Sequence, residues 1–153
     1  MVAAVAVVDQ ATKLLVVMEL GLHETIEVIP GLLNLTHVRN SGVAFGFLNA
    51  ASFAFKPALM AALAFAALIG VALYATQLSP HQKWARTGLA LILGGAAGNL
   101  VDRARQGYVV DFVDVYWGTW HFWAFNVADA AISVGVGMLI LDLLRPAPRV
   151  SVG

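Results

Sequence analysis

The stretch YVVDFVDVYWGTWHFWAFNVAD, residues 108–129, decides how the chain is interpreted, because it places three carboxylates and a run of aromatic rings between two long apolar segments. Ionisable groups beside hydrocarbon are costly, and those that face a bundle interior or an aqueous cavity usually mark a pathway or a reaction centre. We therefore interpret this stretch as a reaction centre at a membrane surface, with Asp111 and Asp129 as the residues to explain.

The composition places the chain among membrane proteins. Of its 153 residues, 60% are hydrophobic and 12% are charged, whereas soluble domains carry roughly 25% charged residues. Nine basic residues balance nine acidic ones, so the chain lacks the basic field that nucleic-acid binding needs, and we exclude that function. The absence of cysteine removes disulfides, thiolate nucleophiles and thiolate metal sites from consideration.

Four apolar segments are each about long enough to cross a bilayer as a helix. We predict a mainly α protein, an integral membrane four-helix bundle with a small extracytoplasmic β-cradle, in a single domain over residues 1–153. The basic bias of the short loop and the tail predicts cytoplasmic N- and C-termini. The predicted transmembrane helices are residues 2–20, 57–78, 84–101 and 125–144, with outer loops at 21–56 and 102–124 and a cytoplasmic loop at 79–83.

Polar residues interrupt two of these apolar segments. Asp9 and Lys13 are spaced i, i+4 with the acid first, which favours a structural ion pair on one helix face, and they argue against a cleaved signal peptide. Asn99, Asp102 and Arg103 cluster near the outer end of the third helix. Lys56, next to the second segment, is expected to extend outward to the membrane surface.

Two outer regions have the pattern of a small sheet. β-branched alternation at residues 25–28 and a second run at 32–38 flank a Pro-Gly turn. Gly107 is expected to end the third helix, and Gly118-Thr119 has the form of a two-residue hairpin turn. The aromatic residues around this turn suit an interfacial belt.

Period-two alternation along an extended segment places Asp111 and Asp114 on opposite faces, so only one of them can point inward with Asp129. The hydrophobic neighbours of Asp111 favour it, and Asp114 is interpreted as a solvated carboxylate. Two carboxyl groups in one site share a proton, which provides a general acid and a general base together.

Two acids alone leave other functions open. The same pair could bind a divalent cation in a metal-dependent membrane hydrolase, or relay protons in a small proton-coupled membrane carrier. The histidines show no ligand spacing with the aspartates, so no metal or other cofactor is expected. The polar groups gather at one end without an internal repeat, which disfavours a carrier. The four histidines are His23, His37, His81 and His121.

Five sequence boxes, in this order, closely resemble those of the bacterial lipoprotein signal peptidases, also called type II signal peptidases. The resemblance extends from Asp9 to about Leu144, nearly the whole chain. The boxes are Asp9-Gln10-x-x-Lys13, Asn40-Ser41-Gly42-Val43-Ala44-Phe45, Gly94-Gly95-Ala96-x-Gly98-Asn99-Leu100-x-Asp102-Arg103, Val109-Val110-Asp111-Phe112 and Phe125-Asn126-Val127-Ala128-Asp129.

This resemblance implies an aspartic endopeptidase of the bacterial inner membrane, active near the outer face as a monomer among membrane lipids. It implies cleavage of a prolipoprotein just before a cysteine that carries diacylglycerol, with Asp111 and Asp129 as the catalytic dyad. The implied substrate-binding residues are Asn40, Gly42, Phe45, Asn99, Arg103, Val109 and Asn126, and the implied supporting residues are Asp9, Lys13, Gly95, Asp102, Phe112 and Ala128.

One feature departs from the family pattern, in which more apolar and basic residues usually precede the Asp-Gln box. Here Asp9 lies about 12 Å of helix from Met1, at 1.5 Å per residue. We expect either a truncated start or a tilted first helix.

Overall fold

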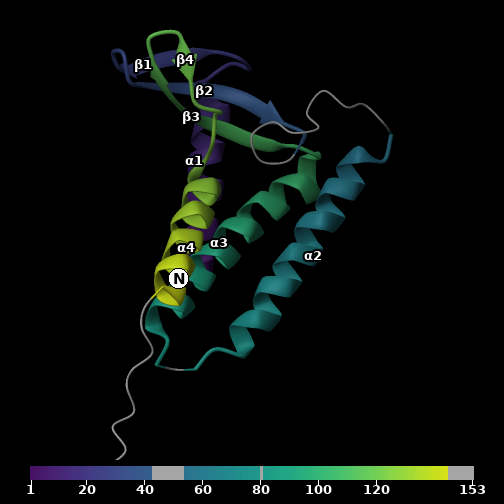
Figure 1. The fold of residues 1–153 in the computed structure, drawn as a ribbon. Coiled ribbons are helices and arrows are strands. Elements are labelled where there is room, and N and C mark those ends of the chain that lie inside the picture. The colour runs from purple at the N-terminus through teal and green to yellow at the C-terminus, as the bar shows by residue number, and fades with distance from the viewer. Residues whose placement is uncertain (43–53, 80, 145–153) are drawn as a thin grey trace, which may run out of the picture.

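The computed structural model describes residues 1–42, 54–79 and 81–144, and Figure 1 shows a sheet lying across one end of a group of helices. The N-terminus and the end of the last helix lie at the opposite end. The elements are α1 Val2–Glu19, β1 Thr25–Ile29, β2 Leu33–Asn40, α2 Lys56–Thr76, α3 Lys83–Gln106, β3 Val109–Trp117, β4 Trp120–His121 and α4 Val127–Leu143. The prediction of a mainly α protein with a small antiparallel sheet is confirmed.

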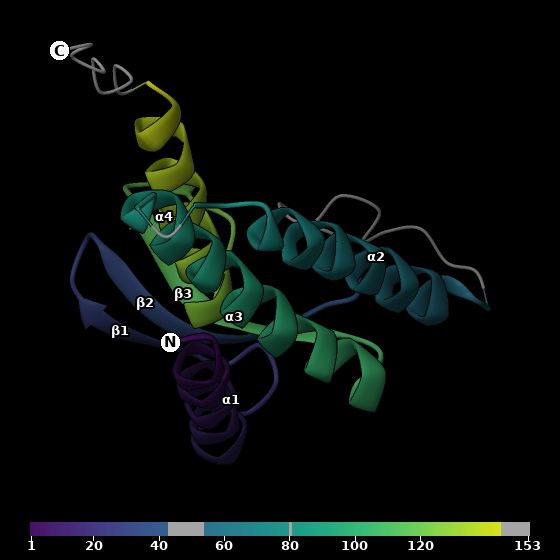
Figure 2. The same cartoon turned by 90° about the horizontal axis from the view of Figure 1, so that it is seen from below.

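Helix α3 is central, since it contacts α1, α2 and α4 (Figure 2). Its glycines allow this close packing. A Cβ atom at Gly95 would collide with the backbone oxygen of Ala128 on α4, and one at Gly98 would lie 2.5 Å from Oδ2 of Asp9 on α1. Larger residues at these positions would therefore push apart the helices that carry the polar residues.

The end of α3 follows the sequence prediction, because Gly107 caps it in the left-handed conformation with φ of 78°. The helix continues beyond the span predicted at residues 84–101, so Asp102 and Arg103 lie on α3 rather than in an irregular outer loop. α4 begins at Val127 instead of residue 125, because Phe125 still forms a β-bridge with Val113.

The four strands form one antiparallel sheet in the order β1-β2-β3-β4. Trp117 pairs with Trp120 across the predicted Gly118-Thr119 turn. Val110 and Phe112 of β3 pack with Val16 and Leu20 at the end of α1, which forms a small apolar core between the sheet and that helix. The position of β3 over the helix ends is thereby fixed by hydrophobic burial.

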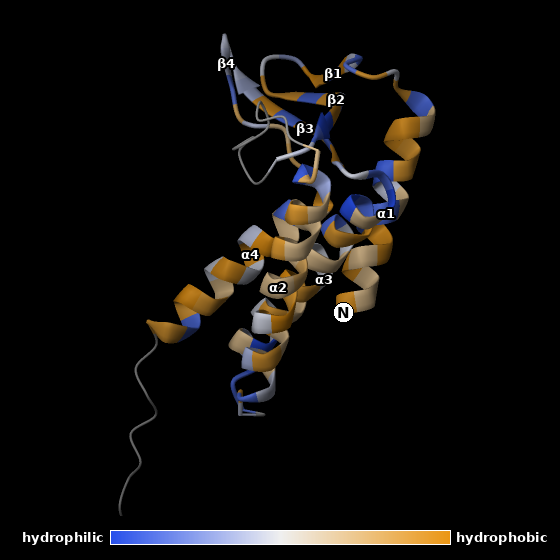
Figure 3. Cartoon of the chain, turned by 90° about the vertical axis from the view of Figure 1, so that its right-hand side faces the viewer, coloured by the Kyte–Doolittle hydropathy of each residue, from blue (hydrophilic) through white to orange (hydrophobic). Residues whose placement is uncertain are grey.

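Hydrophobic residues, coloured orange, make up much of the length of the helices (Figure 3). Val7 and Leu14 of α1, Leu63 and Leu73 of α2, and Leu141 of α4 are among the large hydrophobic residues that remain exposed. Among the described helices, α2 alone combines the length and apolar composition needed to cross a membrane by itself. A surface this apolar is unusual for a soluble protein and typical of contact with lipid or with a partner.

Candidate active site

Asp129 occupies the first turn of α4, where the sequence builds a capping box with the residue that precedes the helix. The Asn126 side chain accepts a hydrogen bond from the Asp129 backbone N–H at 3.0 Å, and the Asp129 carboxylate accepts one from the Asn126 N–H at 3.3 Å. Carboxylates are stabilised at helix N-termini, where backbone N–H groups lack partners. The cap therefore fixes the position of Asp129.

Asp111 lies on β3 and is only 2% exposed. Its Oδ1 accepts a hydrogen bond from Nδ2 of Asn126 at 2.7 Å, and its Oδ2 accepts one from Nδ2 of Asn40 at 3.0 Å. Asn126 thus contacts both aspartates, one through its side-chain nitrogen and the other through the helix cap. β2, β3 and the start of α4 converge on one site.

Burial, and to a smaller extent the charge of Asp129, raise the pKa of Asp111 to about 7, while hydrogen bonds from Asn40 and Asn126 oppose the shift. A carboxyl group with this pKa is about half protonated at neutral pH and largely protonated below it. The site therefore holds a carboxylic acid near a second carboxylate, which is the arrangement that general acid–base chemistry requires.

A second polar cluster lies next to this pair, between α1 and α3. Lys13 forms ion pairs with Asp9 and Asp102, each at 2.8 Å, and it donates a hydrogen bond to Oδ1 of Asn99, also at 2.8 Å. Asn99 in turn donates from Nδ2 to Oδ1 of Asp129 at 2.8 Å. One amide side chain therefore links the cluster to Asp129.

Arg103 lies on the other side of the site. It donates to the backbone oxygen of Gly42 at 3.1 Å and to that of Asn99 at 3.3 Å, while the Gly42 N–H donates to Oδ1 of Asn40 at 3.0 Å. The end of β2 is therefore tied to α3 beside Asp111.

The sequence pattern of the signal peptidase (SPase) II family matches residues 1–145 of the chain. The chain belongs to the signal peptidase II family. Two curated lipoprotein signal peptidases, from Geobacter metallireducens and Syntrophotalea carbinolica, are each 47% identical to it over 145 residues. The alignments cover 95% of this chain, and 88% of the first protein and 89% of the second. The resemblance predicted from the sequence boxes is confirmed.

Solved structures agree with this family membership. A bacterial membrane enzyme matches with a TM-score of 0.82 at 31% identity, covering 94% of this chain and 85% of that one. A second bacterial membrane enzyme matches with a TM-score of 0.81 at 27% identity, covering 95% and 91%. The chain is thus a peptidase of the signal peptidase II family with the fold of a membrane enzyme, which replaces the carrier interpretation.

The geometry brings most of the predicted site residues of this signal peptidase II member together. Asn40, Asn99, Arg103 and Asn126 surround the two aspartates, and Asp9, Lys13 and Asp102 form the adjacent cluster. Val109 is 2% exposed and Phe112 is 6% exposed, so both side chains pack inside the protein. Phe45 lies outside the described residues.

The interpretation of Asp114 as a solvated carboxylate is wrong. Asp114 is only 9% exposed, accepts a hydrogen bond from Nδ2 of Asn34 at 2.9 Å and pairs with Nδ1 of His121 at 2.9 Å. Alternation correctly places Asp114 on the opposite face from Asp111. On that face, side chains of the neighbouring strands, Asn34 of β2 and His121 of β4, contact Asp114 and shield it from solvent. It contributes to the sheet, away from the amides that surround Asp111.

Two further polar residues have roles that the sequence reasoning missed. Gln10 donates from Nε2 to Oδ1 of Asp102 at 2.8 Å and to the Gly98 oxygen at 3.2 Å. Its position next to Asp9 in the first sequence box was the signal that could have predicted this role. Lys56, expected to extend outward, is 5% exposed and donates to Oγ of Ser41 at 3.1 Å. This lysine ties the start of α2 to the end of β2.

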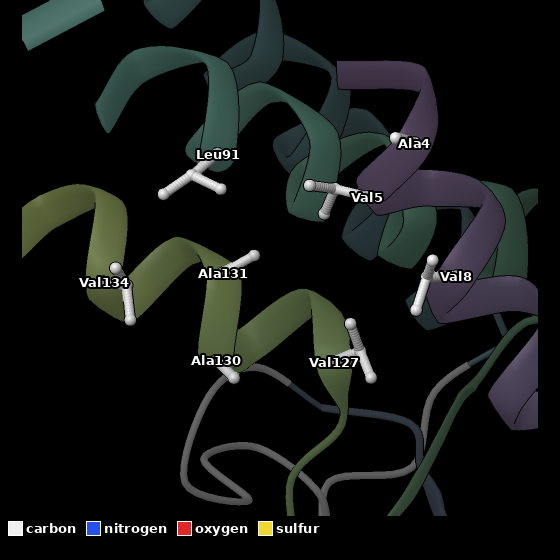
Figure 4. Close-up of a pocket in the computed structure, with 8 residues that line it drawn as sticks. All are labelled: Ala4, Val5, Val8, Leu91, Val127, Ala130, Ala131 and Val134. Carbon is white, nitrogen blue, oxygen red and sulfur yellow. The ribbon is translucent and has the colours of Figure 1, made fainter. Parts of the chain in front are cut away.

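An apolar cavity of about 410 Å³ lies on the other flank of α4 (Figure 4). On α4 its lining residues recur at i, i+3, i+4 and i+7 from Val127, and Asp129 projects roughly 200° round the helix from Val127. The lining contains no ionisable group and cannot perform acid–base chemistry. It consists of Ala4, Val5, Val8, Leu91, Val127, Ala130, Ala131 and Val134.

Proposed function

We propose that this peptidase removes the signal peptide from prolipoproteins by cleaving just before a cysteine that carries diacylglycerol, with Asp111 and Asp129 as the catalytic dyad. The observation that carries this proposal is the convergence of both aspartates on Asn126, which hydrogen-bonds the Asp111 carboxyl and caps the helix that begins beside Asp129. The names of the related proteins, lipoprotein signal peptidases, supply the substrate class.

In this proposal Asp111 is the general acid and Asp129 the general base. The pKa of Asp111, about 7, keeps a proton available to polarise the scissile carbonyl oxygen. Asp129 receives hydrogen bonds from the side-chain N–H of Asn99 and the backbone N–H of Asn126, and these donors offset part of the cost of burying its charge. Each carboxyl group thus has an environment suited to one of the two proton transfers.

The reaction then proceeds through water attack. The water oxygen bonds to the carbonyl carbon, Asp129 takes one water proton, and Asp111 gives its proton to the carbonyl oxygen. As the C–N bond breaks, the nitrogen takes the proton held by Asp129 and leaves as an amine. Asp111 recovers its proton from the intermediate, so both residues return to their starting states.

Asn40, Gly42 and Arg103 are proposed to bind the extended substrate peptide at the edge of β2. Asn40 presents an amide, which can both donate to and accept from a peptide backbone, and Arg103 holds this strand end through Gly42. An extended peptide fits beside a strand end, where main-chain hydrogen bonds provide affinity. The substrate's acyl chains would remain in the surrounding hydrocarbon.

We also propose that all four helices span the bacterial inner membrane, with the dyad near the outer face and both termini in the cytoplasm. Support comes from the exposed apolar residues on the helices and from exposed Trp117, Trp120 and Trp123 at the sheet end, where an interfacial belt is expected. Lys83 and Arg86 lie at the start of α3, away from the sheet. Helix α4, with 17 residues, is about 26 Å long and close to the hydrocarbon thickness.

The test measures cleavage of a lipid-modified precursor by purified protein in which Asp111 or Asp129 is replaced by Asn. Asn keeps the shape but cannot exchange a proton, so each variant should lose activity by about 100-fold or more. Asp142→Asn, the same change near the other end of α4, is the matched control and should remain active. Turnover retained in both dyad variants would overturn the mechanism.

Two further arms of the assay test the substrate class and the metal-dependent alternative. A precursor without the lipid should be cleaved much more slowly, and equal rates would contradict the proposed substrate. Activity in the presence of a divalent-metal chelator should be unchanged, whereas inactivation that added metal reverses would favour a metal-dependent hydrolase.

A further inference from the structure

The buried ammonium group of Lys13 lies among three side-chain oxygen atoms. The side chain is 4% exposed, and the three acceptors, each 2.8 Å away, are Oδ2 of Asp9, Oδ2 of Asp102 and Oδ1 of Asn99. An ammonium has three donors and no acceptor. The ammonium forms ion pairs with the two carboxylates and donates a hydrogen bond to an amide that itself contacts the proposed base.

The third contact determines which way the Asn99 amide points. Its oxygen accepts from Lys13 at 2.8 Å and from Nδ2 of Asn126 at 3.2 Å, so its nitrogen faces Oδ1 of Asp129 at 2.8 Å. The reversed amide would place an NH₂ group against the ammonium and an oxygen against the carboxylate. Both contacts would be repulsive, and hydrogen bonds to charged groups are the strong ones.

We propose that Lys13 is a positioning residue that holds the Asn99 amide with its N–H toward Asp129, so that Asp129 remains ionised and ready to accept a proton from water. The proposal rests on the dyad mechanism above. Lys13 touches neither Asp111 nor Asp129 by hydrogen bond in the described part of the chain, and it acts through Asn99.

Several charged groups surround Asp129, and the test must hold their sum constant. Asp111 faces it from β3, Asp9 and Lys13 from α1, and Asp102 and Arg103 from α3. Replacing Lys13 alone would change the charge of the cluster and leave two carboxylates without their cation. Replacing one acid together with the lysine keeps the cluster's net charge at minus one.

The experiment therefore compares the double variant Lys13→Met/Asp102→Asn with the parent protein, whose cluster has the same net charge, and includes Asp102→Asn alone as the variant that keeps the ammonium. Asp9 keeps donors in both variants, because Oδ1 accepts from the Ala128 N–H at 2.9 Å. Only the double variant lacks the ammonium that orients Asn99. A cavity of about 480 Å³, lined by residues that include Lys13, Asp102 and Gln10, lies beside the substituted side chains and can admit water to them.

In the double variant kcat should fall by about 10- to 100-fold with little change in KM, because one charged hydrogen bond at the base is lost. The acidic limb of its pH profile should move to higher pH, since the ionised base has lost a donor. Asp102→Asn, which keeps the ammonium beside Asn99, should lose less kcat than the double variant and should not share its shifted acidic limb. A double variant with the kcat and pH profile of the parent protein would overturn the proposal, and so would equal profiles in the double and single variants.

A third comparison asks whether Lys13 acts through Asn99. In the Asp102→Asn background, Asn99→Ala should remove most of the effect of replacing Lys13, so that the combined variant is no slower than the Asn99 variant. Additive losses would contradict the proposal, because residues that act through one contact are not additive.

A measurement without a Lys13 variant covers the case in which the double variant does not fold. In the parent protein, the side-chain N–H signals of Asn99 should be protected from exchange and should shift as the dyad titrates. Signals that exchange freely and ignore the dyad titration would overturn the proposal. If Lys13 proves dispensable while Asp111→Asn and Asp129→Asn are inactive, the positioning role fails and the proposed function stands.

Discussion

Two pairs of carboxylates lie side by side in this protein, all of them buried except the half-buried Asp129, and they are stabilised in different ways. Asp9 and Asp102 share the ammonium of Lys13, and Gln10 adds a further donor. Asp111 and Asp129 receive their hydrogen bonds from asparagine side chains and a backbone N–H. Neither member of this second pair forms an ion pair with a basic side chain in the described part of the chain.

The difference shows how one small membrane protein can separate structure from chemistry. The ammonium of Lys13 gives both Asp9 and Asp102 a counter-charge, so we assign a structural role to that pair. Amide donors compensate a carboxylate only in part, and two negative charges in a buried site repel each other. The second pair is therefore the one that holds a proton and can exchange it.

Removing the cation should have the largest effect on stability. Lys13→Met leaves Asp9 and Asp102 buried without a counter-charge, and breaking a buried ion pair in this way costs about 3–5 kcal/mol. Thermal unfolding of purified protein would measure the loss. Lys83→Met, at the exposed start of α3, is the matched control and should change little. Equal stability of the two variants would show that the ammonium does not stabilise the first pair.

The pair of Asp111 and Asp129, which has no cation between its carboxyl groups among the described residues, should make the protein less stable as the pH rises. The folded pKa of Asp111, about 7, lies above the ordinary value of 3.8 for an aspartate, so between these values the folded state binds a proton that the unfolded state has lost. Stability due to this group is therefore full below about pH 4 and is lost as the pH approaches 7, by an amount on the order of 2–4 kcal/mol.

Asp111→Asn should remove most of this pH-dependent loss, whereas Asp142→Asn should retain it. Chemical denaturation at pH 4 and at pH 8 would provide the comparison. A variant at residue 111 that loses as much stability with rising pH as the parent protein would show that Asp111 does not hold the proton.

Close helix packing supports each pair through one glycine of α3. A Cβ at Gly95 would meet the Ala128 backbone oxygen beside Asp129, and a Cβ at Gly98 would meet Asp9. Gly95→Ala should cost about 1–3 kcal/mol through overpacking and reduce activity by shifting α4. Gly70→Ala, where nothing lies within 4 Å, should be neutral or stabilising. Equal unfolding temperatures for the two variants would exclude close packing as the cause.

Much of this architecture could be predicted from the sequence because the signals are local. Apolar runs, the Gly107 cap and the Gly118-Thr119 turn predicted helices, a helix end and a hairpin. The i, i+4 spacing predicted the pair of Asp9 and Lys13. Alternation along β3 separated Asp111 from Asp114, and the resemblance to the family boxes predicted Asp111 and Asp129 as the dyad, which stays a prediction.

The remaining features depend on contacts between distant parts of the chain. Lys13 meets Asn99 across 86 positions, and no periodicity within one helix indicates that contact. The burial of Lys56 depends in the same way on Ser41, and that of Asp114 depends on Asn34. Helical periodicity or strand alternation predicts which way a side chain points. Whether it then meets solvent or another part of the protein depends on how the remaining helices and strands pack around it.

Asp114 gives the smallest predicted effect and the strictest test of the choice between two aspartates on one strand. Its partner His121 has a half-exposed side chain, so solvent weakens the ion pair, and an exposed pair contributes less than about 1 kcal/mol. In Asp114→Asn one oxygen remains for the hydrogen bond from Asn34, so stability should fall by no more than that amount and cleavage should be unchanged. A loss of activity as large as that of Asp111→Asn would mean that both faces of β3 serve the reaction. Asp114 could then no longer be assigned a structural role distinct from the proposed catalytic role of Asp111.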